Sequence, residues 1–260
     1  MKLPFDKSRP EWMGLVAVLI VVVVFGVWMH RREKAPTTPA KRIAIVLDDW
    51  GYSKALLPEV LALDRPLTLA VLPHLFYSSQ VPSGVQNSKC EIILHLPMEA
   101  QSSNVAREPA ILSTKMSKSE VRGLVTRALA TVPRARGVSN HQGSKATKDL
   151  ALMRLLFETL KEEKLFFLDS LVTNESVCES VAKDLGVPFA VRSVFLDNVE
   201  TEEEIAEQLL ELVELVEENG VAIGVGHDKR MTLKVLREWI PKIEEQGIVF
   251  VPLSEVVERL

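Results

Sequence analysis

The sequence predicts an α/β protein whose main part is a (β/α) barrel, preceded by one apolar segment near the N-terminus. From residue 43 onward, short β-branched apolar runs alternate with longer helical patterns, which is typical of βαβ units and a parallel sheet. Seven or eight such repeats in about 220 residues fit a barrel better than an open doubly wound sheet. No G-x-G-x-x-G motif follows the first apolar run, which counts against a dinucleotide-binding fold.

The expected strands are the apolar runs at residues 43–47, 67–72, 92–94, 165–168, 187–191, 221–225 and 248–251, and residues 137–139 predict a further short strand. The clearest helical patterns cover residues 117–131, 148–163 and 202–218. Residues 200–218 hold nine Glu and no basic residue, so a calcium-binding or protein-binding segment is an alternative there. Because apolar residues recur in it at helical spacing, we expect an amphipathic helix with a solvated acidic face.

Composition limits the possible classes of function. The chain of 260 residues is 47% hydrophobic and 25% charged, which excludes a disordered or fibrous protein. Its formal net charge of -4 gives no support to a nucleic-acid-binding protein. Cys90 and Cys178 are too few for a disulfide scaffold or a cysteine-built zinc site. They could pair in an oxidising compartment, but two free thiols are favoured.

The N-terminal segment predicts a transmembrane anchor over residues 12–30. Residues 12–29 carry no charge, and eighteen helical residues span roughly 27 Å, which is enough to cross the hydrocarbon core of a bilayer. Trp12 and Trp28 lie at the two ends, where indole rings favour the membrane interface. A cleaved signal peptide is the alternative, but its apolar region would be shorter and would end at a small-residue site.

Basic residues flank this segment on both sides, so the positive-inside rule does not fix its orientation. In the simplest topology, residues 1–11 form a cytoplasmic tail, residues 31–42 a short stiff linker and residues 43–260 an exported domain. We therefore expect a single-pass protein of the cytoplasmic membrane, held through residues 12–29, whose large domain is extracytoplasmic.

Polar residues follow several of the predicted strands. Asp48 and Asp49 come directly after the first strand, and two adjacent carboxylates are costly to hold together unless a metal ion or a proton neutralises one of them. Three of the five His residues, His95, His141 and His227, also fall at strand ends. The carboxyl ends of barrel strands meet on one rim, where barrel enzymes have their chemistry. These residues therefore predict a metal site with acid–base partners.

The chemistry of such a site indicates hydrolysis. Zinc typically takes three protein ligands, with His and Asp both suitable, and leaves a fourth position for water. It polarises a carbonyl group and lowers the pKa of that water. A nearby carboxylate can take the water's proton, and a His across the pocket can protonate the leaving group. The sequence thus predicts cleavage of an amide or an ester with a divalent metal, zinc being the preferred ion.

Five stretches of the domain contain these strand-end residues, at 44–51 (AIVLDDWG), 95–99 (HLPME), 140–144 (NHQGS), 167–170 (FLDS) and 223–227 (IGVGH). In this order they resemble the divergent polysaccharide deacetylases, which are related to the NodB-type carbohydrate esterases, and the resemblance covers residues 42–260. It implies a distorted (β/α) barrel of the polysaccharide deacetylase type and an extracytoplasmic location. It also implies a divalent metal and removal of N-acetyl or O-acetyl groups from glycans.

The resemblance also assigns roles to single residues. Asp48 matches the catalytic base, Asp49 its metal-binding partner and His95 the first metal-binding His. Asp169 resembles an Asp that orients catalytic groups, and His227 resembles the general acid.

The chain departs from the family pattern at two points. NodB-type enzymes have a second His four residues after the first, and here that position is Glu99. His141 is the best substitute as third ligand, and Glu99 remains an alternative. The usual Arg-containing motif after the fourth strand is replaced by Asn140 and His141. Asn140, Ser144 and Glu99 are the expected contacts to the substrate.

The sequence therefore predicts a membrane-anchored, metal-dependent deacetylase that acts on a glycan of the bacterial cell envelope, either peptidoglycan or another acetylated polysaccharide. One alternative is a catalytically weak or inactive barrel that binds metal or glycan, which the altered metal motif favours and the paired carboxylates oppose. A second alternative is a metal-dependent amidase that acts on the peptide stems of peptidoglycan.

Overall fold

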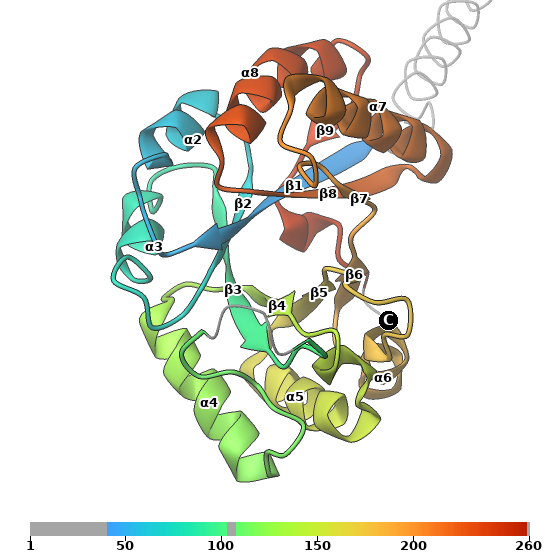
Figure 1. Cartoon of the computed structure of the whole chain (residues 1–260). Helices are drawn as coiled ribbons and strands as arrows, with labels where there is room; N and C mark the ends of the chain where they lie inside the picture. The colour runs from blue at the N-terminus through green and yellow to red at the C-terminus, as the bar shows by residue number, and fades with distance from the viewer. Residues whose placement is uncertain (1–40, 103–107, 259–260) are drawn as a thin grey trace, which may run out of the picture. The chain divides into compact units, whose positions relative to one another are not determined.

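The domain folds around one curled parallel sheet. The computed structural model describes residues 41–102 and 108–258. The strands of this part pair in parallel, and helices cover the outer side of the sheet (Figure 1). The predicted tail, the predicted anchor at 12–30 and most of the predicted linker lie outside the described residues. Among the helices that are described, none has the length and hydrophobicity that a membrane-spanning helix needs.

The strands are β1 (Arg42–Trp50), β2 (Thr68–Val71), β3 (Glu91–Met98), β4 (Gly137–Gln142), β5 (Phe166–Asp169), β6 (Phe189–Val191), β7 (Val194–Phe195), β8 (Val221–His227) and β9 (Val249–Phe250). The helices are α2 (Leu57–Leu63), α3 (Gln80–Gly84), α4 (Lys118–Thr131), α5 (Leu150–Glu163), α6 (Cys178–Leu185), α7 (Glu202–Asn219) and α8 (Arg230–Glu244), with 3-10 turns η1 (Ala146–Lys148) and η2 (Leu253–Glu255). All the strands and helices that the sequence predicts are present. The sequence did not predict β7, because two residues are too few to show an alternation.

Two smaller predictions are also confirmed. The acidic segment forms α7 as an amphipathic helix, and its buried residues are Ile205, Leu209, Leu212, Val213 and Val216. Both cysteines are free thiols, Cys178 buried and Cys90 partly buried.

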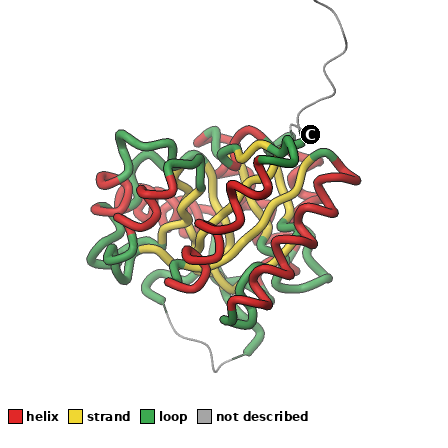
Figure 2. The backbone as a smooth tube through the Cα atoms, turned by 90° about the horizontal axis from the view of Figure 1, so that it is seen from above, coloured by secondary structure: helices red, strands yellow, loops and turns green. Residues whose placement is uncertain are grey.

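The sheet is an incomplete barrel. Its strand order is β6-β5-β4-β3-β2-β1-β8-β7, and β9 pairs with the start of β1. The edge strands β6 and β7 are adjacent in the sequence, with only residues 192 and 193 between them, yet they end opposite edges of the sheet. Figure 2 shows the strands at the centre of the domain with helices outside them. The predicted distorted barrel is therefore a curled half-barrel, open between β6 and β7.

Strand β1 shows how the sequence sets the two sides of the sheet. Ile43, Ile45 and Leu47 belong to the large core between the sheet and the helices. Ala44 and Val46 belong to a second, smaller apolar cluster on the inner side of the curl. Successive side chains of a strand point to opposite faces, so this period of two gives the sheet two buried sides.

The inner side changes from apolar to polar along the strands. In β1, β3 and β8 the inward position that follows the last apolar residue of the inner cluster is Asp48, His95 and His227, respectively. Because the strands are parallel, these positions lie at the same rim of the half-barrel. The alternation that builds the inner cluster therefore also brings these three side chains together.

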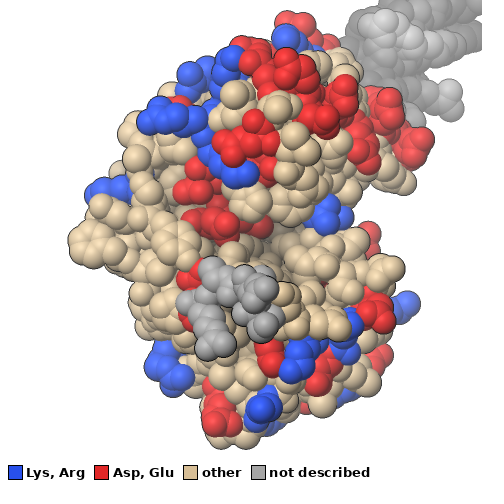
Figure 3. Space-filling model, in the orientation of Figure 1, with Lys and Arg blue, Asp and Glu red and all other residues tan. Residues whose placement is uncertain are grey.

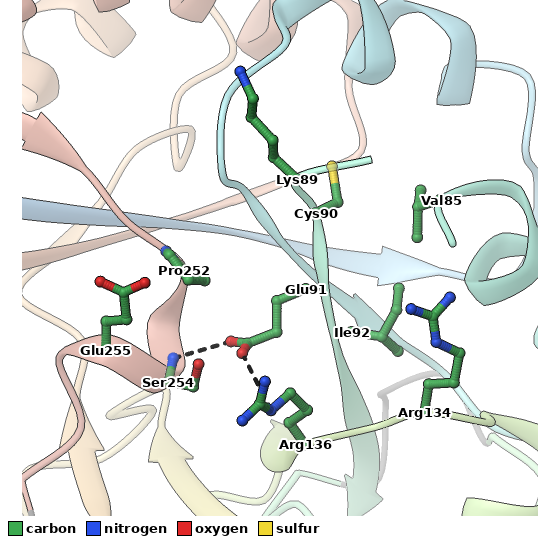
Figure 4. Close-up of a pocket in the computed structure, with 10 residues that line it drawn as sticks. All are labelled: Val85, Lys89, Cys90, Glu91, Ile92, Arg134, Arg136, Pro252, Ser254 and Glu255. Atoms are coloured by element: carbon green, nitrogen blue, oxygen red, sulfur yellow. Dashed lines mark hydrogen bonds and ion pairs between the residues drawn. The ribbon is translucent and has the colours of Figure 1, made fainter. Parts of the chain in front are cut away.

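The opposite end of the barrel has a structural anchor. A cavity of about 470 Å³ lies beside the amino ends of β3 and β4 (Figure 4). At its wall the buried carboxylate of Glu91 accepts the backbone N–H of Ser254 at 3.0 Å and lies 3.4 Å from the Thr68 hydroxyl and 3.8 Å from Arg136 Nε. These contacts connect the turn η2 to the amino ends of β2 and β3. This end of a barrel usually serves stability, so we assign Glu91 a structural role.

Candidate metal centre and active site

A bulge in β1 brings two adjacent carboxylates to one place. The pairing of β1 with β2 shifts by one residue between Leu47 and Trp50, and Asp49 has a φ of 67°. A regular strand would point successive side chains to opposite faces, whereas a bulge lets both face the same side. Accordingly, Asp48 Oδ2 lies 3.7 Å and Asp49 Oδ1 3.4 Å from the same Nε2 atom of His95.

Three side chains at the rim, one each from β1, β3 and β4, bring possible metal ligands together. Asp49 Oδ1 lies 3.0 Å from His141 Nδ1 and 3.4 Å from His95 Nε2, and the two ring nitrogens are 3.2 Å apart. His95 comes from β3 and His141 from β4, and the register of these strands places His141 opposite Pro97. All three ligand atoms lie within 4.8 Å of one another, so the residues could hold a metal ion.

The donor set fits a divalent metal ion. Ligand atoms about 2.1 Å from a tetrahedral zinc ion are about 3.4 Å apart, close to the separations found here. Asp49 Oδ1 is buried and has no hydrogen-bond partner among the described residues. His95 Nδ1 shares a hydrogen bond with Ser139 Oγ at 2.8 Å, so Nε2 is the nitrogen that faces Asp49 and His141. A second partner of this kind is usual for a histidine that binds metal.

The two carboxylates differ in their affinity for protons. Burial raises the pKa of Asp48 above its ordinary value, against the lowering effect of His95. Burial also acts to raise the pKa of Asp49, but the close approach of the His141 and His95 rings to its carboxylate outweighs burial and holds that pKa well below the usual range. Asp49 is therefore suited to stay anionic as a ligand, whereas Asp48 is the more basic carboxylate. Moreover, Asp48 Oδ1 is buried without a hydrogen-bond partner among the described residues.

His227 is held in one orientation by Asp197. Its Nδ1 lies 2.8 Å from Asp197 Oδ1, and its backbone N–H donates to Asp197 Oδ2 at 2.8 Å. Thr232 donates to the same carboxylate at 2.7 Å. Consequently Nε2 is the ring nitrogen on the side of Asp49, and it lies 3.8 Å from Asp49 Oδ2. Burial alone would lower the pKa of His227, but the hydrogen bond and charge of Asp197 raise it above the ordinary value.

Asp228 adds a further carboxyl beside these residues. Burial, together with the charge of Asp49, raises the pKa of Asp228 to about 7. Its backbone N–H donates to the carbonyl oxygen of Asp48 at 3.3 Å, which ties the end of β8 to β1. Sequence reasoning did not single out Asp228, although it directly follows His227.

Sequence reasoning also missed Asp197, and a signal for it was present. Residues 195–197 read Phe-Leu-Asp, as do residues 167–169 at the end of β5. The predicted orienting residue, Asp169, is buried, and its carboxylate accepts from the Ser176 hydroxyl at 2.6 Å and from the Leu171 N–H at 2.8 Å. In this structure the carboxylate hydrogen-bonded to His227 is thus that of Asp197.

Two of the predicted substrate contacts, Asn140 and Ser144, form hydrogen bonds with backbone groups of the rim. Asn140 is buried, accepts the Ser170 N–H at 2.9 Å and donates to the carbonyl of Gln142 at 2.9 Å. Ser144 Oγ accepts the N–H of Gln101 at 3.0 Å. Both side chains therefore support the loops around the site.

Glu99 lies apart from the three possible ligands. Its carboxylate pairs with Lys145 and accepts from the Thr114 N–H at 2.8 Å and from the Ser113 hydroxyl at 2.9 Å. Lys145, first among these contacts, lowers the pKa of Glu99 to about 2. Of the two alternatives for the third ligand, the described geometry brings His141, and not Glu99, next to Asp49.

The rim also presents apolar surface. Tyr52 and Phe76, 57% and 79% exposed, lie in the loops after β1 and β2. Leu171, Val172 and Val199 are exposed in the loops after β5 and β7. The space-filling view shows a hollow across this face of the domain, with acidic side chains along its wall (Figure 3). Several loops that follow strands of the half-barrel thus carry exposed apolar side chains.

Sequence comparison gives relatives for most of the chain. The model of the family described as divergent polysaccharide deacetylase matches residues 45–257. The uncharacterised protein YibQ of Escherichia coli (strain K12) is 34% identical over 201 residues, which covers 77% of this chain and 63% of that protein. An uncharacterised protein of Haemophilus influenzae is 32% identical over 204 residues, covering 78% and 72%. The chain therefore matches less than two thirds of the length of its Escherichia coli relative.

Solved structures share the fold. An uncharacterised protein from Agrobacterium tumefaciens C58 has a TM-score of 0.80 at 22% identity, covering 86% of this chain and 92% of that one. A CE4 family pseudoenzyme from Bacillus anthracis has a TM-score of 0.54 at 14% identity, covering 86% and 67%. The catalytic domain of a peptidoglycan N-acetylglucosamine deacetylase from Eubacterium rectale ATCC 33656 has a TM-score of 0.51 at 12% identity, covering 84% and 90%. With a family model that matches most of its length and a fold shared with these proteins, the chain belongs to the divergent polysaccharide deacetylase family.

Proposed function

We propose that the protein is a metal-dependent hydrolase that removes acetyl groups from a glycan of the cell envelope. The observation that carries this proposal is the convergence of Asp49, His95 and His141 beside Asp48 and His227 on one rim of the half-barrel. Membership of the divergent polysaccharide deacetylase family supports the substrate class. A fold shared with a peptidoglycan N-acetylglucosamine deacetylase supports it further.

Asp49, His95 and His141 would hold the metal ion, and the His and carboxylate donors favour zinc. Such an ion would supply Lewis acidity to the acetyl carbonyl. With three protein ligands, the site would keep an open position, as catalytic zinc sites do.

Asp48 would serve as the general base. Its carboxylate is buried beside the metal-ligand group, with Oδ2 3.7 Å from His95 Nε2. Its other oxygen has no hydrogen-bond partner among the described residues and can therefore accept a proton from an attacking water. Burial raises its pKa, which makes it a better proton acceptor than an exposed aspartate.

His227 would serve as the general acid. Asp197 occupies its Nδ1 and fixes the ring, so Nε2 is the nitrogen that can deliver a proton to the leaving amine or alcohol. The net rise in the pKa of His227 keeps the ring protonated to a higher pH, which suits an acid. Asp48 and His227 thus supply the two proton transfers that deacetylation requires.

The apolar residues of the rim suit a sugar chain. The exposed rings of Tyr52 and Phe76 offer flat apolar faces next to polar groups, on which the faces of pyranose rings can pack. We propose peptidoglycan or another acetylated polysaccharide as the substrate. The proposed location is the extracytoplasmic side of the cytoplasmic membrane, with residues 12–30 as the anchor, and rests on the sequence of that segment.

A barrel that binds metal or glycan without turnover is the second candidate. The replacement of the family's second metal-binding His by Glu99, which is tied to Lys145, favours it. The fold shared with a CE4 family pseudoenzyme supports this candidate.

The test measures zinc content and acetate release by the full-length protein on acetylated chito-oligosaccharides and on peptidoglycan. Stoichiometric zinc with acetate release is the expected result. Stoichiometric zinc without acetate release would favour the binding protein, and released peptide stems would favour an amidase. A protein that binds no divalent metal would overturn the proposal.

A further inference from the structure

Glu108 lies behind one of the possible metal ligands. Its Oε1 is 3.9 Å from Nε2 of His141, on the ring nitrogen opposite the one that faces Asp49. The Glu108 side chain is only 6% exposed, although the residue lies in the segment between β3 and α4. A carboxylate this buried needs partners, because burying an unpaired charge is costly, and the imidazole of His141 is one of the groups beside it.

Both histidines of the proposed site need a partner for the ring nitrogen that does not face Asp49. Each presents one ring nitrogen to Asp49, and a metal-binding imidazole usually donates its other N–H to a fixed acceptor, which sets the tautomer and the ring orientation. For His95 the partner is Ser139, at 2.8 Å from Nδ1. For His141 the residue in the corresponding position is Glu108.

Tyr52 holds Glu108 in this place. The Tyr52 hydroxyl donates to Glu108 Oε1, the same oxygen that faces His141. Tyr52 comes from the loop after β1, three residues beyond Asp49, so the two loops that meet here both adjoin the possible metal ligands. If Glu108 only linked the two loops, its contact with Tyr52 would be enough. The structure also places its carboxylate beside the imidazole of His141.

We propose that Glu108, fixed by Tyr52, is a positioning residue that orients His141 toward the metal ion and thereby sets the zinc affinity of the site. The inference rests on the proposed metal site. Glu108 itself donates nothing to the metal, because it lies at the ring nitrogen of His141 that faces away from Asp49.

The experiment measures the zinc affinity of the full-length protein by competition with a chromophoric chelator. Mutation of an outer residue that orients a metal ligand typically costs 10–100-fold in metal affinity. We therefore expect Glu108→Gln and Glu108→Ala to bind zinc about 10–100-fold more weakly, and Tyr52→Phe to show a smaller loss in the same direction. The matched control is Glu244→Gln, which removes a carboxylate paired with Arg65 at 2.6 Å and lying on α8, away from the rim.

Thermal unfolding of the zinc-free variants separates positioning from folding. The proposal expects Glu108→Gln and Tyr52→Phe to unfold at the wild-type temperature without zinc and to bind zinc more weakly. Wild-type zinc affinity in both variants would overturn it, as would a loss of affinity explained by lower zinc-free stability. If the wild-type protein itself bound no zinc, the proposed metal site would fail instead, so the two failures are distinguishable.

Discussion

The carboxylates of Asp48 and Asp49 approach the same nitrogen of His95, although the two residues are adjacent in a β-strand. The bulge that permits this needs a positive φ at Asp49, a conformation that costs free energy for most residues and that Asp tolerates better than most. Strained backbone is often kept at functional sites. Here the strained backbone separates two proposed roles, because Asp49 joins the possible metal ligands and Asp48 stays beside them.

The first prediction concerns the three proposed metal ligands. Single replacements Asp49→Gly, His95→Ala and His141→Ala should each lower the zinc content of the purified protein, because each leaves an incomplete set of ligands. Gly is chosen at position 49 because it accepts the positive φ and so avoids a second effect on the backbone. Zinc content after dialysis is the measurement. If Glu99→Ala lost zinc while His141→Ala kept it, the choice of third ligand would be wrong.

The second prediction concerns the proposed base. Asp48→Asn should leave zinc bound and the fold intact, yet acetate release should fall by roughly 10²–10⁴-fold, the usual effect of removing a positioned proton acceptor. Rates on an acetylated chito-oligosaccharide, together with zinc content and circular dichroism, give the comparison. An unchanged rate in a zinc-loaded variant would contradict the role of Asp48 as base.

The third prediction concerns stability at the far end of the barrel. Glu91→Ala removes the acceptor of the Ser254 N–H, and leaving a buried donor unpaired costs about 1–3 kcal/mol of the free energy of unfolding. Glu91→Gln keeps an acceptor oxygen and loses only the ion pair with the exposed Arg136, worth about 0–1 kcal/mol. Urea denaturation of the two variants measures the difference. Equal stabilities would show that the contact to the turn η2 contributes nothing.

The fold could be predicted from the sequence because β1, β3 and β8 each contain an apolar run that is buried on both faces. The rim residues could be predicted because parallel strands end at the same edge, so a polar residue after each run has a defined place. Strand β7 has only two residues and shows no such pattern. Because the strand was not predicted, Asp197, which follows it, was not predicted as a rim residue.

The identity of the third ligand depends on register, which the sequence does not encode locally. The pairing of β3 with β4 sets His95 opposite Ser139 and Pro97 opposite His141. Two residues of shift in this pairing would move His141 away from Asp49 and leave a different side chain in its place. The choice between Glu99 and His141 therefore needed the three-dimensional structure.

The last prediction concerns Asp197 and the pH dependence of the reaction. A general acid must be protonated, so the rate should fall as the pH rises through the pKa of His227. Burial lowers that pKa, and the hydrogen bond and charge of Asp197 raise it above the ordinary value. Removing the charge of Asp197 should therefore lower the pKa of His227, and the alkaline fall of the rate should begin at a lower pH.

The variant Asp197→Asn tests this, because an amide oxygen can still accept from Nδ1 at a similar distance to the present 2.8 Å. The measurement is the profile of kcat/KM against pH for the wild type and the variant, at equal zinc content. Asp169→Asn is the comparison variant, since that carboxylate binds Ser176 and the Leu171 N–H and makes no described hydrogen bond to His227. For Asp169→Asn we expect the fall of kcat/KM at alkaline pH to occur at the same pH as in the wild type. If this fall moved in the Asp169 variant and not in the Asp197 variant, Asp169 would be the residue that orients the acid, as the family resemblance implies.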